Sequence, residues 1–322
     1  MTSKVKKWGG RVFFCLLISL LINTEAFALD KKASSALSHY IMALMHDRLG
    51  NPDKAIAEYK RALRLDYKNS TIHLNLAASY IKSNKLDEAV GELNLAASFD
   101  PEAVEPHAIL ALLYSLQNKE EPATAEYETA LKNASKLEPR NIDIYKSLGL
   151  IYLRQKKLEA AEKIYRLILD LSPSDSEAHF FLGNIYYQLG NQALGEKELK
   201  QAIELKPDYA EALNYLGYTY VEENRNLEQA ETMIKKALEI EPDNAAYIDS
   251  LGWLYFRRAK YKEAGAQLEK ASALLDDPVI YEHLGEVYFK TGDSEKAKLN
   301  WQKSLELNPG QEQLRKKLEK IK

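Results

Sequence analysis

The sequence repeats itself about every 34 residues between Ala36 and Gln311, and this repetition restricts the possible folds more than any other feature. A small residue returns near the middle of each expected first helix, an aromatic residue usually follows three positions later, and a proline usually ends the unit. The small residues are Ala43, Ala77, Ala111, Gly149, Gly183, Gly217, Gly252 and Gly285. A fixed period of this length is typical of a solenoid whose units contact only their neighbours, and it favours a binding surface over a catalytic pocket.

Each unit is expected to form two antiparallel helices joined by a short turn. Between positions 176 and 209, Leu182, Ile185 and Leu189 recur at helical spacing and define one apolar face. Gly190 then interrupts the helix, and a second amphipathic stretch ends before Pro207. Because paired helices must approach each other closely, a small residue is expected where they cross.

The pattern resembles the tetratricopeptide repeat, in which small, aromatic, alanine and proline residues occupy fixed positions of the unit. The last unit carries it at Leu284, Gly285, Tyr288, Ala297, Trp301 and Pro309. The resemblance implies an all-α fold, a right-handed α-solenoid of about eight helical hairpins with a C-terminal capping helix at 312–322. After a short segment at 29–35, the units are expected at 36–69, 70–103, 104–141, 142–175, 176–209, 210–244, 245–277 and 278–311.

Departures from the period add local detail. Four additional residues lie between Ala130 and Pro139, and we expect them to add one turn, about 6 Å, to the second helix of the third unit. One additional residue lies in the turn of the sixth unit, near Arg225. Since the crossing residue also changes from alanine to glycine after the third unit, we infer two blocks, 36–141 and 142–311, that need not be separate domains. Ser174 with Glu177 has the spacing of a capping box.

The first 28 residues have the features of a secretory signal peptide. A basic segment precedes an apolar run from Val12 to Ile22, and small residues flank Phe27. Cleavage is expected after Ala28, which predicts an exported protein, in the periplasm or peripheral to the outer membrane. The alternative is an uncleaved membrane anchor, although the apolar run has only about half of the ~20 residues that span a bilayer.

The composition argues against several kinds of chemistry. Cys15 is the only cysteine and lies within the apolar run, so the exported chain would have no disulfide, thiolate nucleophile or cysteine-based metal site. The net charge of −3, without a basic stripe, does not favour nucleic acid. The sequence contains no glycine-rich phosphate loop, nucleophile elbow or zinc-protease motif. We therefore expect no enzyme, no catalytic residues, no cofactor and no small-molecule substrate.

Histidines recur in the repeats without indicating a metal site. His39, His73 and His107 occupy position 4 of the first three units, and His179 does so in the fifth. Equivalent positions in stacked units are separated by about 10 Å, whereas zinc requires ligand atoms within about 2.1 Å. A structural role is therefore expected for these side chains, with no metal bound. His283 stands outside the series and is interpreted as an isolated side chain.

The resemblance also implies that positions 2, 5, 9, 12 and 13 of each first helix line a groove that binds a protein or peptide. In units five to eight these positions mix aromatic, amide and acidic side chains, which suits an extended or helical peptide with basic residues. The expected partner-binding residues are Phe180, Asn184, Tyr187, Asn214, Tyr218, Asp249, Trp253, Phe256, Glu282, Glu286 and Phe289. The alternative is that some of the aromatic residues pack only between neighbouring units.

The same positions in units one to three are small and aliphatic. They are Leu37, Tyr40, Leu44, Leu74, Ala78, Ile81, Ala108 and Leu112. An exposed apolar stretch of this size would mark an interface. It would accept either the chain's own segment at 29–35 or a second protomer, so self-association through units one to three stays open.

Two stretches, 249–253 (DSLGW) and 278–285 (PVIYEHLG), resemble exported tetratricopeptide proteins of the bacterial cell envelope. That resemblance implies adaptors for periplasmic proteases, or parts of export and assembly machinery. The expected function is a non-catalytic scaffold or adaptor in the cell envelope that binds a protein or peptide in the groove. The alternative is a structural subunit of a secretion, pilus or polysaccharide-export assembly.

Overall fold

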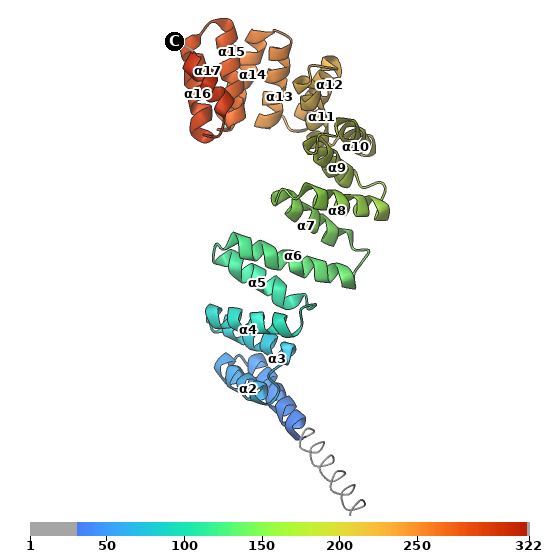
Figure 1. Ribbon diagram of the computed structural model, residues 1–322, viewed down its shortest axis with the longest axis vertical. Coiled ribbons are helices and arrows are strands. Elements are labelled where there is room, and N and C mark those ends of the chain that lie inside the picture. The colour runs from blue at the N-terminus through green and yellow to red at the C-terminus, as the bar shows by residue number, and fades with distance from the viewer. Residues whose placement is uncertain (1–30, 321–322) are drawn as a thin grey trace, which may run out of the picture. The chain divides into compact units, whose positions relative to one another are not determined.

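The computed structural model describes residues 31–320, and within this range the chain forms helices joined by short turns, without a strand (Figure 1). The first helix covers residues 31–48. It is followed by α2 (Pro52–Leu65), α3 (Ser70–Lys82), α4 (Leu86–Phe99), α5 (Glu105–Leu116), α6 (Glu120–Leu137), α7 (Ile142–Arg154), α8 (Leu158–Leu171), α9 (Ser176–Gln188), α10 (Gln192–Leu205), α11 (Ala210–Glu222), α12 (Leu227–Ile240), α13 (Ala245–Arg257), α14 (Tyr261–Leu274), α15 (Pro278–Thr291), α16 (Ser294–Leu307) and α17 (Glu312–Lys320). The all-α repeat solenoid predicted from the period is confirmed. The expected signal peptide at 1–28 lies outside the described residues.

Successive helices pack in pairs, and within each compact unit neighbouring pairs pack on one another. Pairs form between α3 and α4, α5 and α6, α9 and α10, α11 and α12, α13 and α14, and α15 and α16. The chain divides into two compact units, a first unit that ends at Ile151 and a second unit that begins at Tyr152. This division falls inside α7, shortly after the block boundary inferred at position 141.

The helices of a pair cross where the sequence places a glycine. A Cβ atom added to Gly285 would lie 2.2 Å from Trp301, and one added to Gly252 would lie 2.7 Å from Leu268. At Gly217 the nearest side-chain atom would be 2.8 Å away, whereas ordinary contact begins near 3.4 Å. The prediction that small residues permit a close helix crossing is therefore confirmed at these positions.

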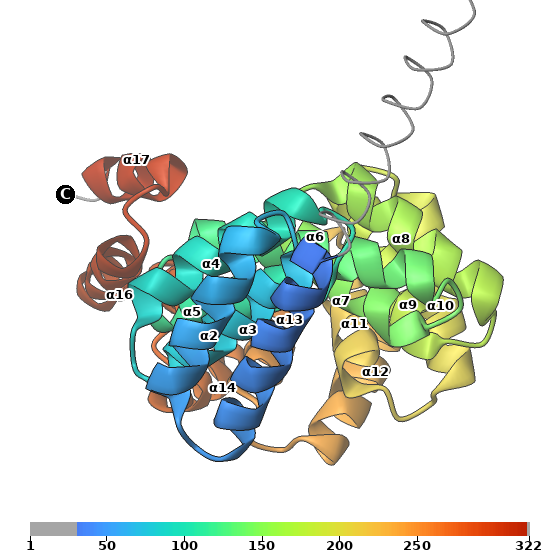
Figure 2. The same ribbon diagram turned by 90° about the horizontal axis from the view of Figure 1, so that it is seen from below.

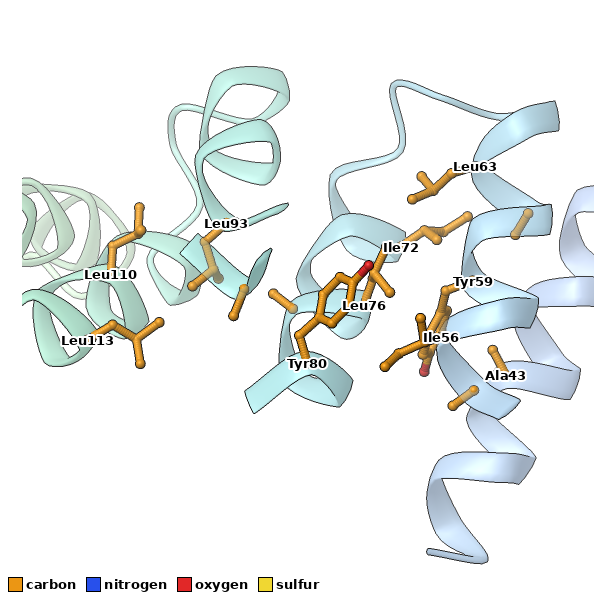
Figure 3. Packing of buried hydrophobic residues seen from close by; sticks show 14 residues of the cluster. Ala43, Ile56, Tyr59, Leu63, Ile72, Leu76, Tyr80, Leu93, Leu110 and Leu113 are labelled. Atoms are coloured by element: carbon orange, nitrogen blue, oxygen red, sulfur yellow. The ribbon is translucent and has the colours of Figure 1, made fainter. Parts of the chain in front are cut away.

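The core of the first unit forms between neighbouring pairs. Figure 3 shows Ile56, Tyr59 and Leu76 directed toward one another from α2 and α3, and both Tyr59 and Leu76 are fully buried. The Tyr59 hydroxyl donates to Asp47 at 3.0 Å, and the Ser79 hydroxyl donates to the same carboxylate at 2.8 Å. The polar atoms that accompany this apolar core are thus hydrogen-bonded, as burial requires.

The turn inside each repeat ends its first helix with the same hydrogen bond. In the second repeat, the Lys85 amide donates to the Tyr80 carbonyl at 2.9 Å, and Asn84 between them has φ of 56°. This is a Schellman motif with a left-handed residue. The left-handed residues of the eight repeats are Gly50, Asn84, Asn118, Lys156, Gly190, Asn224, Ala259 and Gly292. In the sixth repeat, Asn226 is a second left-handed residue, and it accommodates the additional residue predicted there.

The extra helical turn predicted for the third repeat is present in α6. This helix has 18 residues, whereas its counterpart α4 has 14. Asn133 is buried in the added part of the pair and donates to the carbonyl oxygens of Pro101 at 2.8 Å and Ala103 at 3.3 Å. The insertion therefore ties α6 to the loop that precedes α5.

The last helix closes the second unit. Figure 2 shows α17 beside α16, and Leu314 of α17 is buried against Ala297 and Trp301 of α16. The predicted capping helix is thus in place over the described residues. Within 31–320, no helix is both long enough and apolar enough to cross a membrane.

Two predicted boundaries are wrong. Residues 31–35 continue the first helix, so they are not a separate segment free to lie along the aliphatic surface. The cap of α9 is Asp175, whose carboxylate accepts from the Ala178 amide at 2.9 Å, and not Ser174 with Glu177. The helix starts one residue later than the predicted capping box requires, so the Asp175 carboxylate accepts from the Ala178 amide where Ser174 would have accepted from the Glu177 amide.

Candidate functional site

The repeated histidines pair with glutamates of their own repeats. Each Nδ1 atom lies 2.6 Å from a carboxylate oxygen nineteen residues later, in the pairs His39–Glu58, His73–Glu92, His107–Glu126 and His179–Glu198. Every pair joins the first helix of a repeat to its second helix. Across residues 31–320, no group of three or more potential metal ligands comes together. By pairing with these glutamates, the position-4 histidines link the two helices of their repeats.

His73 uses both ring nitrogens. Its Nε2 atom lies 2.7 Å from the Tyr67 carbonyl, while Nδ1 faces Glu92, so two acceptors surround one imidazole. Burial lowers the pKa of His73, but the hydrogen bonds to Glu92 and to the Tyr67 carbonyl outweigh that effect, and the pKa lies above its ordinary value. The protonated imidazolium, which donates from both nitrogens, fits this site.

His283 is not isolated, contrary to the sequence-based interpretation. Its Nδ1 atom lies 2.9 Å from Asp249, and its ring stacks on Trp253 with centroids 4.0 Å apart and planes 7° apart. Trp253 also stacks on Phe256 at 4.5 Å and donates to Glu222 at 2.5 Å. Asp249 and Trp253 of α13 are both buried, and His283 of α15 contacts each of them. The alternative in which aromatic residues pack between repeats therefore describes Trp253 well.

Three predicted residues line a pocket in the second unit. Asn214 and Tyr218 come from α11 and Asp249 comes from α13, and the start of α15 closes the pocket. Its volume is about 300 Å³. The sequence analysis missed the other lining residues, which are Tyr215, Ala246, Ser250, Leu275, Asp277, Val279 and Ile280. Tyr215 and Ser250 occupy position 6, which the positions implied by the resemblance leave out, whereas Ala246 and Val279 occupy position 2 and were not among the expected residues.

The pocket contains two carboxylates, Asp249 and Asp277, and an amide acceptor. Asn214 Oδ1 is buried without a hydrogen-bond partner. Burial raises the pKa of Tyr218, and the carboxylates of Glu222, Asp249 and Glu282 raise it further. The surroundings of Tyr218 therefore carry negative charge.

Phe180, Asn184 and Tyr187 lie on α9, in the repeat before the pocket, and do not line it. Phe180 packs against Tyr209 and Tyr215, with ring centroids 5.2 Å and 6.1 Å away. Tyr187 covers Gly195 and leaves its hydroxyl buried and unpartnered, and burial raises its pKa. Asn184 accepts a hydrogen bond from a neighbouring glutamine of its own helix. All three side chains are half-buried.

The predicted acidic residues of α15 are engaged by the C-terminal segment. Gln311 donates to Glu282 at 3.1 Å, and Lys317 forms an ion pair with Glu286 at 2.6 Å. Phe289, in contrast, is 46% exposed. A partner at Glu282 or Glu286 would therefore compete with bonds inside the chain, and contact of these residues with a partner stays a prediction.

The aliphatic surface predicted in the first unit is partly covered. Tyr40, Leu44, Leu74 and Ile81 pack against the core, Ala78 is half-buried, and Leu37, Ala108 and Leu112 are exposed. The sequence analysis missed a second apolar face on the first helix. Met42 is 47% exposed and Met45 is 54% exposed, whereas Leu76 and Ser79, at the same positions of the next repeat, are fully buried.

Comparisons with known proteins agree with this architecture. Family models described as Tetratricopeptide repeat match residues 48–113, 110–176, 176–209, 198–232 and 279–311. The chain is similar to the structure of a tetratricopeptide repeat protein from Parabacteroides merdae, with 20% identity and a TM-score of 0.58 over 78% of this chain and 97% of that one. It is also similar to a chain of the APC/C hetero-tetramer Cut9-Hcn1, with 19% identity and a TM-score of 0.59 over 84% of this chain and 52% of that one. A search of the curated proteins gives no match.

Proposed function

Because the chain belongs to the tetratricopeptide repeat family, whose members are generally non-catalytic interaction scaffolds, we propose that it is an adaptor that holds a protein or peptide in the bacterial cell envelope. The partner binds along the first helices of the second unit. The observation that carries the proposal is the pocket lined by Asn214, Tyr218 and Asp249, because three of the expected groove residues, from two helices, meet there. A concave site with apolar walls and a few polar groups is the usual form of a recognition site.

The position in the cell envelope rests on the sequence. The basic segment, the apolar run and the small residues before Leu29 together support export and cleavage. Fractionation of cells that express the chain, followed by N-terminal sequencing, tests this. The expected product begins at Leu29 and leaves the cytoplasm, whereas an uncleaved chain in the cytoplasm would contradict the proposed location.

Partner binding is tested by substitution in the pocket. Asn214→Arg fills the pocket with a long charged side chain, and Asn94→Arg makes the same change on an exposed position of α4. Each variant is cross-linked in envelope fractions, and the captured proteins are compared by mass spectrometry. The proposal expects that Asn214→Arg loses a partner that both the unchanged protein and Asn94→Arg retain. Equal capture by both variants, with equal helicity, would contradict it.

The captured partner also distinguishes the two roles. A protease or its substrate, recovered in variable amounts, supports an adaptor. A complex with fixed stoichiometry supports the alternative, a structural subunit of an assembly.

Self-association forms part of the same proposal and uses the exposed face of Met42 and Met45. In the second repeat the equivalent residues, Leu76 and Ser79, are buried against the first repeat, so among residues 31–320 the face of Met42 and Met45 is a stacking surface that no repeat covers. A second copy can present the same face and bury both. Sedimentation equilibrium of the full chain tests this, because Met42→Glu with Met45→Glu is expected to convert dimer to monomer. A monomeric unchanged protein would refute self-association and leave the adaptor role intact.

A further inference from the structure

We infer that the pocket between α11, α13 and the start of α15 binds the side chain of a lysine or arginine that projects from an extended partner segment. This inference rests on the proposed function, because it names the chemical class of the partner at the proposed site. Four features of the pocket lead to it: its charge, its preformed geometry, its aromatic wall and its unpartnered acceptor.

The charge of the pocket is negative. The side chains of Asp249 and Asp277 both line it, and no lysine, arginine or histidine lines it. Charges of one sign at a concave site attract a partner group of the opposite sign. A basic side chain is the group in proteins that satisfies two carboxylates, and guanidinium does so with several donors at once.

Both carboxylates are held in place before a partner binds. Asp277 caps α15 and accepts from the Val279 amide at 2.7 Å. Asp249 Oδ1 faces His283 Nδ1 at 2.9 Å, which leaves Oδ2 for a ligand. Preorganised acceptors lose little conformational freedom on binding, so more of the interaction energy appears as affinity.

The walls suit a long basic side chain. Tyr215, Tyr218, Leu275 and Ile280 all line the pocket. Lysine and arginine place an aliphatic stem along apolar surface and keep the charged head at polar groups, and a cation near a tyrosine ring gains further attraction. The volume of about 300 Å³ is at the small end of ligand pockets, which fits one anchored side chain better than a whole ligand.

Asn214 supplies the remaining acceptor. Its Oδ1 atom is buried and has no hydrogen-bond partner, and an unsatisfied buried acceptor is energetically unfavourable. A donor that enters with the partner, either the backbone N–H or the basic head group, would satisfy it. The raised pKa of Tyr218, caused by burial and by the carboxylates of Glu222, Asp249 and Glu282, agrees with an acidic environment.

Selection from a random library tests the inference. The immobilised full chain selects dodecapeptides displayed on phage, and the selected peptides are sequenced and synthesised. The expected result is enrichment of lysine or arginine at one position. Replacement of that residue by norleucine is expected to weaken binding about tenfold to a hundredfold, as for loss of one charge-assisted hydrogen bond.

Two variants that differ only in location complete the test. Asp277→Asn removes a pocket charge while asparagine preserves the helix cap. Asp293→Asn makes the same change at the cap of α16, outside the pocket. The selected peptide is expected to bind Asp277→Asn about tenfold more weakly and Asp293→Asn unchanged. A third variant, Asp249→Asn, keeps an acceptor for His283 and is expected to behave as Asp277→Asn does.

The outcomes separate this inference from the proposed function. Peptides that bind without any basic residue, and lose affinity with Asn214→Arg, would overturn the inference and support the binding site. Equal effects of Asp277→Asn and Asp293→Asn would also overturn it. Failure to select any peptide would count against the peptide-binding function itself, and with it the inference.

Discussion

Gly285→Ala is expected to destabilise the second unit, although alanine ordinarily stabilises a helix. Gly285 lies in α15, where it crosses α16. A Cβ atom there would be 2.2 Å from both Cδ1 and Nε1 of Trp301, so the indole would have to move by more than 1 Å to reach ordinary contact near 3.4 Å. Trp301 is almost fully buried, and a rigid ring in a packed site cannot move without displacing its neighbours.

The size of the effect follows from three contributions. Overpacking of a core costs about 1–3 kcal/mol. A shifted indole also loses the hydrogen bond from Nε1 to the Glu282 carbonyl, now 3.2 Å long, which is worth about 1 kcal/mol. The gain in helix propensity offsets about 1 kcal/mol. The net loss is therefore about 2 kcal/mol, or a decrease of about 4–8 °C in melting temperature for a unit of this size.

Gly91→Ala is the matched control. Gly91 also lies inside a helix, α4, but a Cβ atom added there would meet nothing within 4 Å. The same substitution is therefore expected to stabilise the first unit by about 1 kcal/mol. Thermal unfolding followed by circular dichroism gives both midpoints. Hydrogen exchange locates the changes, which are expected in α15 and α16 for Gly285→Ala and in α3 and α4 for Gly91→Ala.

A double-mutant cycle tests whether Trp301 is the cause. In a Trp301→Leu background the ring is gone, so Gly285→Ala is expected to cost at least 1 kcal/mol less than it does in the unchanged protein. The reasoning would be refuted if Gly285→Ala stabilised the protein as Gly91→Ala does. If Gly285→Ala lowers the free energy of unfolding equally in both backgrounds, the clash with the Trp301 indole is not the cause of the destabilisation.

Three further predictions concern the turns, the cap and a histidine. Ala259→Gly is expected to stabilise the second unit by about 0.5–1 kcal/mol in urea unfolding, because Ala259 is exposed and has φ of 57°, which glycine adopts more readily than alanine. The same substitution at an alanine with φ of about −60° would destabilise the protein instead. Leu314→Ala is expected to cost about 2–3 kcal/mol and to increase amide exchange in α17, with the first unit unchanged, because Leu314 packs on Trp301. His73 has a raised pKa, so its pairing with Glu92 stabilises the folded state below the ordinary histidine pKa and is lost as the pH rises through the raised pKa. The melting temperature of the unchanged protein should therefore fall more between pH 6 and pH 9 than that of His73→Gln, and equal slopes would contradict this.

The repeat pattern predicted the helices well because each unit obeys local rules. Glycine at a crossing, such as Gly252, has consequences that stay within one helical pair, and the four additional residues near Asn133 lengthen a single helix. The choice of cap at Asp175 was missed, because two neighbouring polar residues can cap the same helix and only geometry selects one.

The candidate site was only partly predictable. Positions 5 and 9 include Asn214, Tyr218 and Asp249, which line one pocket, while their contact with a partner stays a prediction. The pairing of His283 with Asp249 joins position 6 of one repeat to position 5 of the previous one, and periodicity within a repeat does not specify it. The pocket also includes helix starts, whose placement depends on how neighbouring repeats stack.

The added turn of α6 indicates which length changes this chain tolerates. A residue advances a helix by about 100°, so four residues rotate the chain by about 400° and return its apolar side to within about 40° of the original direction. Two residues would rotate it by about 200° and turn that side toward water. Insertions inside these helices are therefore expected to survive in whole turns, as in α6, whereas single residues are accommodated where a left-handed residue such as Asn226 absorbs them. Sequences that descend from such a repeat array should differ in length by whole helical turns inside helices or by single residues in the turns. An insertion or deletion of another length would mark a repeat that has lost its partner helix.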